Sequence, residues 1–247
     1  LKKYLKHKNC FTLNKMGFKC GIVGLPNIGK STLFNALTKS SIPAENFPFC
    51  TIEPNVGKVP LPDKRLKNIN DIVDSKKIIP ASLDLVDIAG LVKGASQGEG
   101  LGNAFLSNIR EMNALAHVVR CFDDDNVTHV DGSIDPVRDA EIINLELIYS
   151  DLETVSKRLM KCEKLLKTND KKNKLEHEVL VKIKNELDQG NLININDFDE
   201  EGKIILKSYQ LLSSKPTFYI ANISDDGSSA KKLNDLEEFA KKSGSTV

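Results

Sequence analysis

Apolar and polar positions follow two patterns along the chain, and the change falls near residue 135. In the first part, short apolar runs alternate with helical periodicity. The predicted elements there are strands at 18–23, 82–88 and 116–122, helices at 30–39 and 103–115, and a Pro-rich polar stretch at 42–64. Strands that alternate with helices predict a parallel sheet covered by helices.

The pattern after residue 135 is helical. Seven apolar residues recur at alternating spacings of three and four, which predicts one long helix with a three-heptad seam beginning near Pro136. The seam residues are Leu145, Ile148, Leu152, Val155, Leu159, Cys162 and Leu166. A polar turn at 168–174 should precede a second helix at 175–189, which carries Leu180, Ile183 and Leu187 on one stripe and ends at Gly190. A third helical stretch at 199–213 carries Ile204, Ile205 and Leu212.

The strand pattern returns at 217–221, and a helix is expected at 229–242. We therefore predict one α/β domain, residues 16–135 and 214–247, interrupted by a helical coiled-coil insertion at 136–213. Residues 1–15 contain five lysines and no acid, so we expect a disordered basic tail, with a targeting leader as the alternative. A strand pattern that starts at 246 predicts that the chain is a fragment.

Composition narrows the class of protein. The 247 residues carry a net charge of +1, so binding to nucleic acid or membrane would need a local patch. Apolar runs fall short of the roughly 18 residues of a membrane span. Five scattered cysteines without a CxxC pair are typical of reduced thiols. The composition predicts a cytoplasmic protein with no membrane partner.

A phosphate-binding motif follows the first predicted strand. Residues 24–32 read GLPNIGKST, the G-x-x-x-x-G-K-[ST] pattern, and they open the first helix as the motif requires. We expect the backbone of Asn27, Ile28, Gly29 and Thr32 to surround phosphates, Lys30 to neutralise them, and Ser31 to bind Mg²⁺.

Two further segments complete a nucleotide-dependent switch. Asp87-Ile88-Ala89-Gly90 follows a strand, so Asp87 should support Mg²⁺ and Gly90 should approach the γ-phosphate. Thr51 lies between helix and sheet, where a switch loop would offer its hydroxyl to the metal.

Four segments resemble the YchF/Obg-like ATPase family, a branch of the Obg-related P-loop GTPases. They are MGFKCGIVGLPNIGKSTLFNALT, NFPFCTIEPNVG, DIAGLVKGASQGEGLGNAFL and HVVRCF, within a resemblance that covers residues 16–247. The resemblance implies a P-loop G domain with a mostly parallel sheet and helices on both faces, a coiled-coil insert, and a TGS domain beyond this chain. It also implies ATP hydrolysis and association with ribosomes.

Hydrolysis needs a water-orienting group. Leu91 occupies the position where related hydrolases often carry glutamine, and it cannot orient water. The resemblance places the family's candidate histidine at His129, with a solvated loop histidine as the alternative. His117 begins an apolar strand and is interpreted as structural. Asn27 is a candidate ligand for K⁺, as in potassium-stimulated relatives, or else shapes the loop.

Base recognition is assigned to Asn222-Ile223-Ser224-Asp225. Ile223 stands where GTPases carry the lysine that packs over guanine, and the absence of that lysine favours ATP. Asp225 departs from the family's usual glutamate and restores a guanine-reading carboxylate.

Three functions remain open. The first is a Mg²⁺-dependent ATPase linked to the ribosome, with Lys30 and His129 as catalytic residues. The second is a GTP-specific switch in ribosome assembly, and the third is a nucleotide-gated scaffold with little turnover. Lysine-rich runs at 161–174 and 231–242 contain acids and lack aromatic residues, so we interpret them as solvated helix faces and expect no sequence-specific DNA binding.

Overall fold

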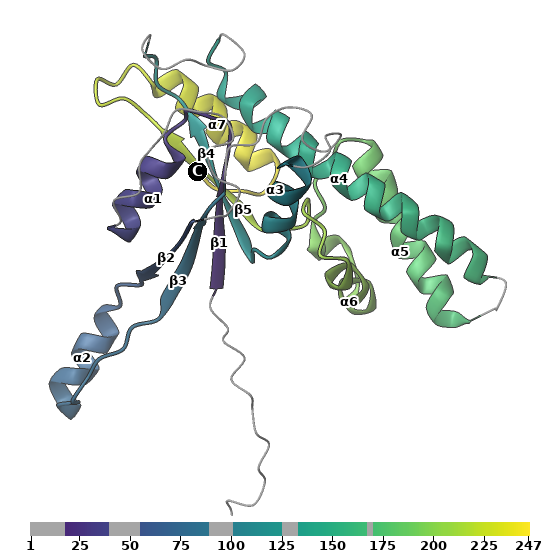
Figure 1. Ribbon diagram of the computed structural model, residues 1–247, viewed down its shortest axis with the longest axis horizontal. Coiled ribbons are helices and arrows are strands. Elements are labelled where there is room, and N and C mark those ends of the chain that lie inside the picture. The colour runs from purple at the N-terminus through teal and green to yellow at the C-terminus, as the bar shows by residue number, and fades with distance from the viewer. Residues whose placement is uncertain (1–17, 40–54, 89–100, 125–132, 167–169) are drawn as a thin grey trace, which may run out of the picture.

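A computed structural model describes residues 18–39, 55–88, 101–124, 133–166 and 170–247 (Figure 1). Five strands form one sheet, and helices lie around it and extend away from it. In chain order, the elements are β1 (Phe18–Val23), α1 (Lys30–Thr38), β2 (Asn55–Pro60), α2 (Lys64–Val73), β3 (Ser82–Asp87), α3 (Leu101–Arg110), β4 (Ala114–Arg120), α4 (Pro136–Leu165), α5 (Lys171–Asp188), the 3₁₀ turn η2 (Ile195–Asp197), α6 (Glu200–Tyr209), β5 (Thr217–Asn222) and α7 (Ala230–Lys242).

The sheet has the order β2-β3-β1-β4-β5. Its pairs are parallel except for β2 with β3, which is antiparallel. All seven residues of β4 are buried. Because successive side chains of a strand point to opposite faces, this burial means that both faces of the sheet are covered. The α/β fold class is therefore confirmed, with one antiparallel edge strand.

One long helix, α4, belongs to two hydrophobic cores. Its Ile143 and Leu147 pack in the core of the sheet with residues of β1, β3 and α3. Its Ile148, Val155 and Cys162 pack in a second core with α5 and α6. In Figure 1, α4 and α5 lie side by side and reach away from the sheet. The two cores share one continuous helix, so the helical region is joined to the sheet without a break in packing.

Polar contacts hold the middle of α4 in place. The Asp151 carboxylate is fully buried and accepts bonds from the backbone N–H groups of Leu212 and Ser213 and from the Ser213 hydroxyl. The Arg110 guanidinium at the end of α3 donates to Ser150 Oγ at 3.4 Å and to Thr154 Oγ1 at 3.3 Å. These contacts fix α4 against both the α6–β5 connection and α3.

Several predicted boundaries were wrong. No element was assigned to residues 65–81, and 42–64 was interpreted as an irregular polar stretch, yet β2 and α2 lie here. Asp63 marks the start of α2, since its carboxylate accepts from Arg65 N. The helix predicted at 103–115 ends at Arg110, and β4 begins at Ala114.

Two corrections concern the helical region. Residues 171–174 belong to α5 and not to the predicted turn, because Asp170 caps that helix. Two apolar residues of the predicted stripes are exposed: Ile204 by 70% and Leu145 by 39%. Ile148, Val155, Cys162, Leu180, Ile183 and Leu187 are buried as predicted.

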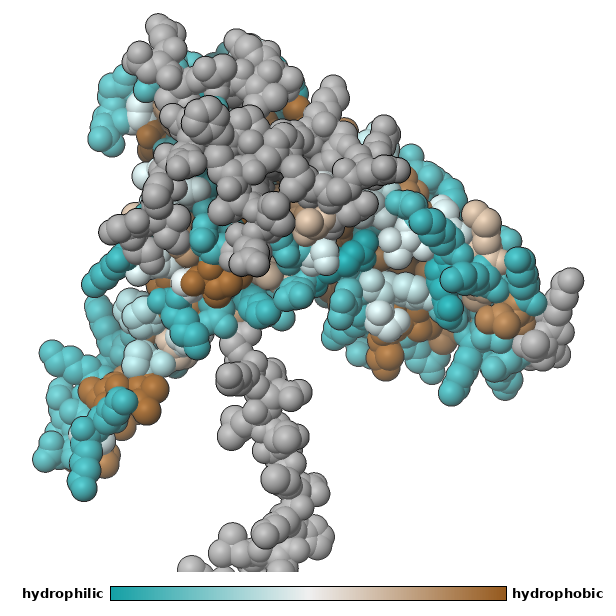
Figure 2. Space-filling view, in the orientation of Figure 1, coloured by the Kyte–Doolittle hydropathy of each residue, from teal (hydrophilic) through white to brown (hydrophobic). Residues whose placement is uncertain are grey.

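An apolar surface lies on α2, which projects from the edge of the sheet (Figures 1 and 2). Its side chains include Ile69, Ile72 and Val73, exposed by 57%, 86% and 66%. These residues are at positions i, i+3 and i+4, so they lie on one side of the helix.

Candidate nucleotide-binding site

The phosphate loop connects β1 to α1, the strand–turn–helix context that the motif requires. Gly24 has φ 148° and Gly29 has φ 93°, both in the region that favours glycine. A Cβ at Gly24 would lie 2.5 Å from the Val118 carbonyl oxygen, and one at Gly29 would lie 2.7 Å from Asn222 Nδ2. The backbone therefore approaches β4 and β5 closely at both glycines, which leaves no room for a side chain.

Lys30 is the first residue of α1 and is only 7% exposed. Its ammonium group donates to the Leu25 carbonyl oxygen at 2.5 Å, across the loop. Burial lowers the pKa of Lys30 from 10.5 to about 8, and the nearby Asp87 carboxylate opposes part of that change. A buried ammonium inside a loop of backbone N–H groups is a site for anionic phosphate.

Ser31 and Asp87 meet beside the loop although they are 56 residues apart in sequence. The Ser31 hydroxyl donates to Asp87 Oδ2 at 2.8 Å. Asp87 Oδ1 is buried and has no hydrogen-bond partner among the described residues. Burial raises the pKa of Asp87, while the Ser31 bond and the Lys30 charge lower it. A hydroxyl and an unpartnered carboxylate oxygen fit the oxygen ligands that Mg²⁺ prefers.

Asn222 lies at the end of β5 and contacts the phosphate loop directly. Its side-chain amide donates to the Ile28 carbonyl oxygen at 3.0 Å. Ile223 is 49% exposed, and Asp225 is also exposed. The structure thus brings the residues predicted to read the base next to those predicted to hold phosphate, with Asn222 as the connection.

Asp226 was not identified from the sequence, although it shapes the loop that carries Asp225. Its Oδ1 accepts from the hydroxyls of Ser224 and Ser228 at 2.6 and 2.7 Å, and from Ser228 N at 2.9 Å. These bonds lower the pKa of Asp226 to about 2. An aspartate two residues before a serine in a Gly-containing turn is a recognisable signal for such a loop.

The remaining predicted residues occupy different positions. Thr32 is exposed in the first turn of α1. Asn27 has φ 61°, so it contributes to the shape of the loop. Thr51, Gly90, Leu91 and His129 lie outside the described residues, as does the 1–15 segment.

His117 is buried inside β4 with 2% exposure, where its ring lies 5.2 Å from that of Tyr219. Burial lowers the pKa of His117 to about 3, and the Lys30 charge acts in the same direction. The ring is therefore neutral near pH 7, as a structural histidine would be. The described cysteines, Cys20, Cys121 and Cys162, are buried and unpaired.

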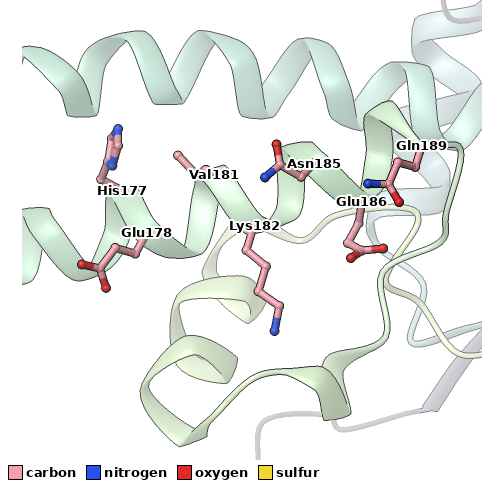
Figure 3. Close-up of a pocket in the computed structure, with 7 residues that line it drawn as sticks. All are labelled: His177, Glu178, Val181, Lys182, Asn185, Glu186 and Gln189. Carbon is pink, nitrogen blue, oxygen red and sulfur yellow. The ribbon is translucent and has the colours of Figure 1, made fainter.

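Two hollows among the described residues lie away from the phosphate loop. One is an open groove of about 570 Å³ along α5, where Glu178, Lys182 and Glu186 form one row and His177, Val181, Asn185 and Gln189 another (Figure 3). The second, larger hollow is lined by residues of α4, of α7 and of the segment that follows α5. Neither contains a residue predicted to bind nucleotide or metal.

The sheet, the glycine-rich loop and the Ser31–Asp87 pair define a P-loop nucleotide-binding G domain. The family model described as 50S ribosome-binding GTPase matches residues 19–151. The chain belongs to this family.

Comparison with individual relatives confirms the resemblance to YchF proteins. The chain is 52% identical over 233 residues to the "Ribosome-binding ATPase YchF" of Escherichia coli O157:H7, covering 94% of this chain and 64% of the relative. The same-named Bacillus subtilis protein is 52% identical over 211 residues, or 85% of this chain and 58% of the relative. The chain therefore spans less than two thirds of the length of these relatives.

A solved structure gives the same result for the fold. The "Structure of the Schizosaccharomyces pombe YchF GTPase" superimposes with a TM-score of 0.74 at 38% identity, covering 94% of this chain and 64% of that one. Within the described ranges, none of the helices is long and apolar enough to cross a bilayer. P-loop GTPases as a class use Mg²⁺ with their nucleotide.

Proposed function

We propose that this protein is a Mg²⁺-dependent nucleotide hydrolase that prefers ATP and works as a ribosome-associated switch. The observation that carries the proposal is the Ser31–Asp87 pair beside the buried Lys30 ammonium. The printed names of the relatives, ribosome-binding ATPases at 52% identity, support the substrate and the partner. We further propose that the protein acts in the cytoplasm.

Each group has a proposed task. Lys30 and the amides of the loop hold the phosphates, and Gly90 allows close approach to the γ-phosphate. Ser31, Asp87 and Thr51 hold Mg²⁺, which when bound would neutralise charge between the β- and γ-phosphates. Asn222, Ile223 and Asp225 surround the base. His129 orients water, and Asn27 assists K⁺; both roles come from the resemblance.

The division into domains is also a proposal. Residues 136–213 form the helical coiled-coil insertion, and 16–135 with 214–247 form the G domain. The second hydrophobic core, in which α4 from Ile148 onward packs with α5 and α6, supports a helical unit, while Ile143 and Leu147 near the start of α4 still pack in the core of the sheet. Residues 1–15 are proposed to be a basic tail or leader.

GTP is the alternative substrate, and the exposure of Asp225 favours it, because an exposed carboxylate in the loop after β5 is accessible to guanine donors. Titration with fluorescent ATP and GTP analogues, in Mg²⁺ with K⁺ and again with Na⁺, separates the two. Tighter ATP binding supports the proposal, and tighter GTP binding contradicts it and supports a GTP switch. Equal nucleotide binding in K⁺ and in Na⁺ contradicts a role for Asn27 in binding K⁺.

Variants test the roles of individual residues. Lys30→Ala should abolish nucleotide binding, since it removes the cation from the loop. Ser31→Ala should reduce Mg²⁺-dependent affinity by at least tenfold while EDTA reduces the remaining affinity little. Turnover that persists in Lys30→Ala would contradict the assignment, and binding with no turnover in the unaltered protein would favour a scaffold.

A further inference from the structure

Two adjacent aspartates lie in the loop between β5 and α7, residues 223–229, which we call the base loop. Both Asp225 and Asp226 are exposed, but their surroundings differ. Asp226 Oδ1 accepts three hydrogen bonds, from the hydroxyls of Ser224 and Ser228 and from Ser228 N. Within the described residues, no hydrogen bond or ion pair involves the Asp225 carboxylate. One carboxylate is therefore occupied by its own loop, and the other is left to contact a ligand.

Both ends of the base loop are fixed. At its start, the Asn222 amide donates to the Ile28 carbonyl oxygen of the phosphate loop at 3.0 Å. The Asn222 carbonyl oxygen accepts from Cys121 N at 2.8 Å, which ties the same residue to the end of β4. At the end of the loop, Ser229 is buried, and its hydroxyl oxygen accepts from Ser224 N at 3.1 Å. Only the segment between these two anchors has the freedom to change its conformation.

The helix that follows the base loop is fixed as well. Lys232, in the first turn of α7, forms an ion pair with Asp123, which follows β4. Leu236 and Ala240 of α7 pack in a hydrophobic core with Tyr219 of β5. In Figure 1, α7 lies along the sheet over its whole length. A displacement of Asp225 must therefore come from the base loop itself and not from a movement of α7.

Asp226 supplies the bonds that close the middle of the base loop. Its Oδ1 lies 2.6 Å from the hydroxyl oxygen of Ser224, which precedes Asp225, and 2.7 Å from that of Ser228, which follows it. The bonds therefore hold the chain on both sides of Asp225. Gly227, with φ 77°, allows the chain to turn back between them. Because the acceptor is charged, these bonds are stronger than bonds between neutral groups.

The position of Asp225 matters more for guanine than for adenine. An ionised carboxylate only accepts hydrogen bonds. Guanine offers two neighbouring donors, at N1 and N2, and one correctly placed carboxylate accepts from both. Adenine has an acceptor at N1 and one donor nearby, at N6. A carboxylate that loses its fixed direction therefore loses more of its interaction with guanine than with adenine.

We propose that Asp226 is a positioning residue that directs Asp225 at the base and so determines how the site discriminates between GTP and ATP. The inference rests on the proposed function, because that function places the base beside Asn222 and Asp225. Asp226 acts through Asp225, while the phosphates are held separately by the loop that carries Lys30.

The test compares Asp226→Ala with Asp226→Asn, which removes the charge but keeps an oxygen that accepts hydrogen bonds. The matched control is Asp235→Ala, because Asp235 is an exposed aspartate of α7 and its loss removes the same charge without changing the base loop. Dissociation constants for ATP, GTP and tripolyphosphate, each with Mg²⁺, are measured by competition with a fluorescent nucleotide analogue. Tripolyphosphate has no base, so its binding reports the phosphate loop alone.

In Asp226→Ala, the affinity for GTP should fall by about tenfold and that for ATP by less than about threefold. Binding of tripolyphosphate should not change. Asp226→Asn should recover most of the GTP affinity, and Asp235→Ala should match the unaltered protein. In Asp226→Ala, KM for GTP should rise while kcat at saturating GTP stays within about twofold. Unchanged GTP affinity would overturn the proposal, and so would equal losses for GTP, ATP and tripolyphosphate, which would mean general damage to the site.

A double-mutant cycle shows whether Asp226 acts through Asp225. In an Asp225→Ala background, Asp226→Ala should weaken GTP binding by less than about twofold, because the group that it positions is gone. The same tenfold loss in both backgrounds would show that Asp226 acts independently of Asp225, and the proposal would be wrong.

Three outcomes separate this inference from the proposed function. If the unaltered protein binds GTP more tightly than ATP and Asp226→Ala removes that difference, the ATP preference is wrong and the positioning role stands. If the unaltered protein prefers ATP and Asp226→Ala leaves the ratio of the two affinities unchanged, the proposed function stands and the positioning role is wrong. If neither nucleotide binds, both are wrong, because the base loop then has no base to recognise.

Discussion

Replacing Lys30 with methionine should stabilise the protein in the absence of nucleotide while abolishing nucleotide binding. The folded-state pKa of Lys30 is about 8, below its ordinary 10.5, because the ammonium is buried. The folded protein therefore holds this proton less tightly than the unfolded chain does. Burial of the charge destabilises the fold below pH 8, and this cost disappears as the pH rises from about 8 to 10.5.

The difference of 2.5 between these pKa values corresponds to about 3 kcal/mol at pH 7. Methionine removes this cost and keeps an apolar stem of similar length, but it leaves the Leu25 carbonyl oxygen without its donor, which costs about 1 kcal/mol. The expected net gain is about 2 kcal/mol, or roughly 4–8 °C in Tm for a chain of this size.

Urea denaturation without nucleotide, at pH 7 and pH 10, measures the effect. The advantage of Lys30→Met should be about 2 kcal/mol at pH 7 and fall below about 1 kcal/mol at pH 10, where Lys30 is largely neutral in the folded protein. Lys67→Met on the exposed surface of α2 is the control and should change little at either pH. A Lys30→Met protein that is less stable at pH 7, or an advantage that does not depend on pH, would refute the reasoning.

Three further substitutions test the structure. Asp151→Asn should lower the free energy of unfolding by about 2 kcal/mol, because one amide oxygen cannot accept from all three donors; an unchanged Tm in thermal unfolding would contradict this. Gly24→Ala should lose nucleotide binding or more than about 2 kcal/mol of stability, since its Cβ would lie 2.5 Å from a β4 carbonyl oxygen, and normal analogue titration with normal stability would disprove the clash. Tyr209→Phe should cost about 1–2 kcal/mol in urea denaturation, because its hydroxyl bonds to Arg158 and Glu176, and no loss would mean that those two residues suffice.

The phosphate loop and the buried strands were predictable from the sequence because their signals are local. The run 18–23 is apolar enough to identify β1 without its neighbours, and the fixed spacing of Gly24, Gly29 and Lys30 requires a strand before it and a helix after it. Likewise, the spacing of Leu180, Ile183 and Leu187 predicts that they share one buried face of α5, and all three are buried.

Features that depend on distant partners were not predictable. The strand β2 is stabilised by antiparallel pairing with β3, while its own sequence contains glycine and proline. The spacing of Ile204 is that of a core residue. However, α6 is short, and its Ile204 side chain is 70% exposed to solvent. Asp151 is an ordinary acid in the sequence, and only the fold brings the 212–213 amides to it.

The helix α4, shared by both hydrophobic cores, has a mechanical consequence. Its 30 residues form one continuous helix of about 45 Å at 1.5 Å each, which packs in the sheet core at Ile143 and Leu147 and in the second core from Ile148 to Cys162. The contact with α3, at Ser150, lies 15 residues or about 22 Å from the far end of α4, so a tilt of roughly 5° there would move that end by about 2 Å. The helix is therefore a lever: a small rotation of α4 against α3 displaces its far end together with the part of α5 that packs on it.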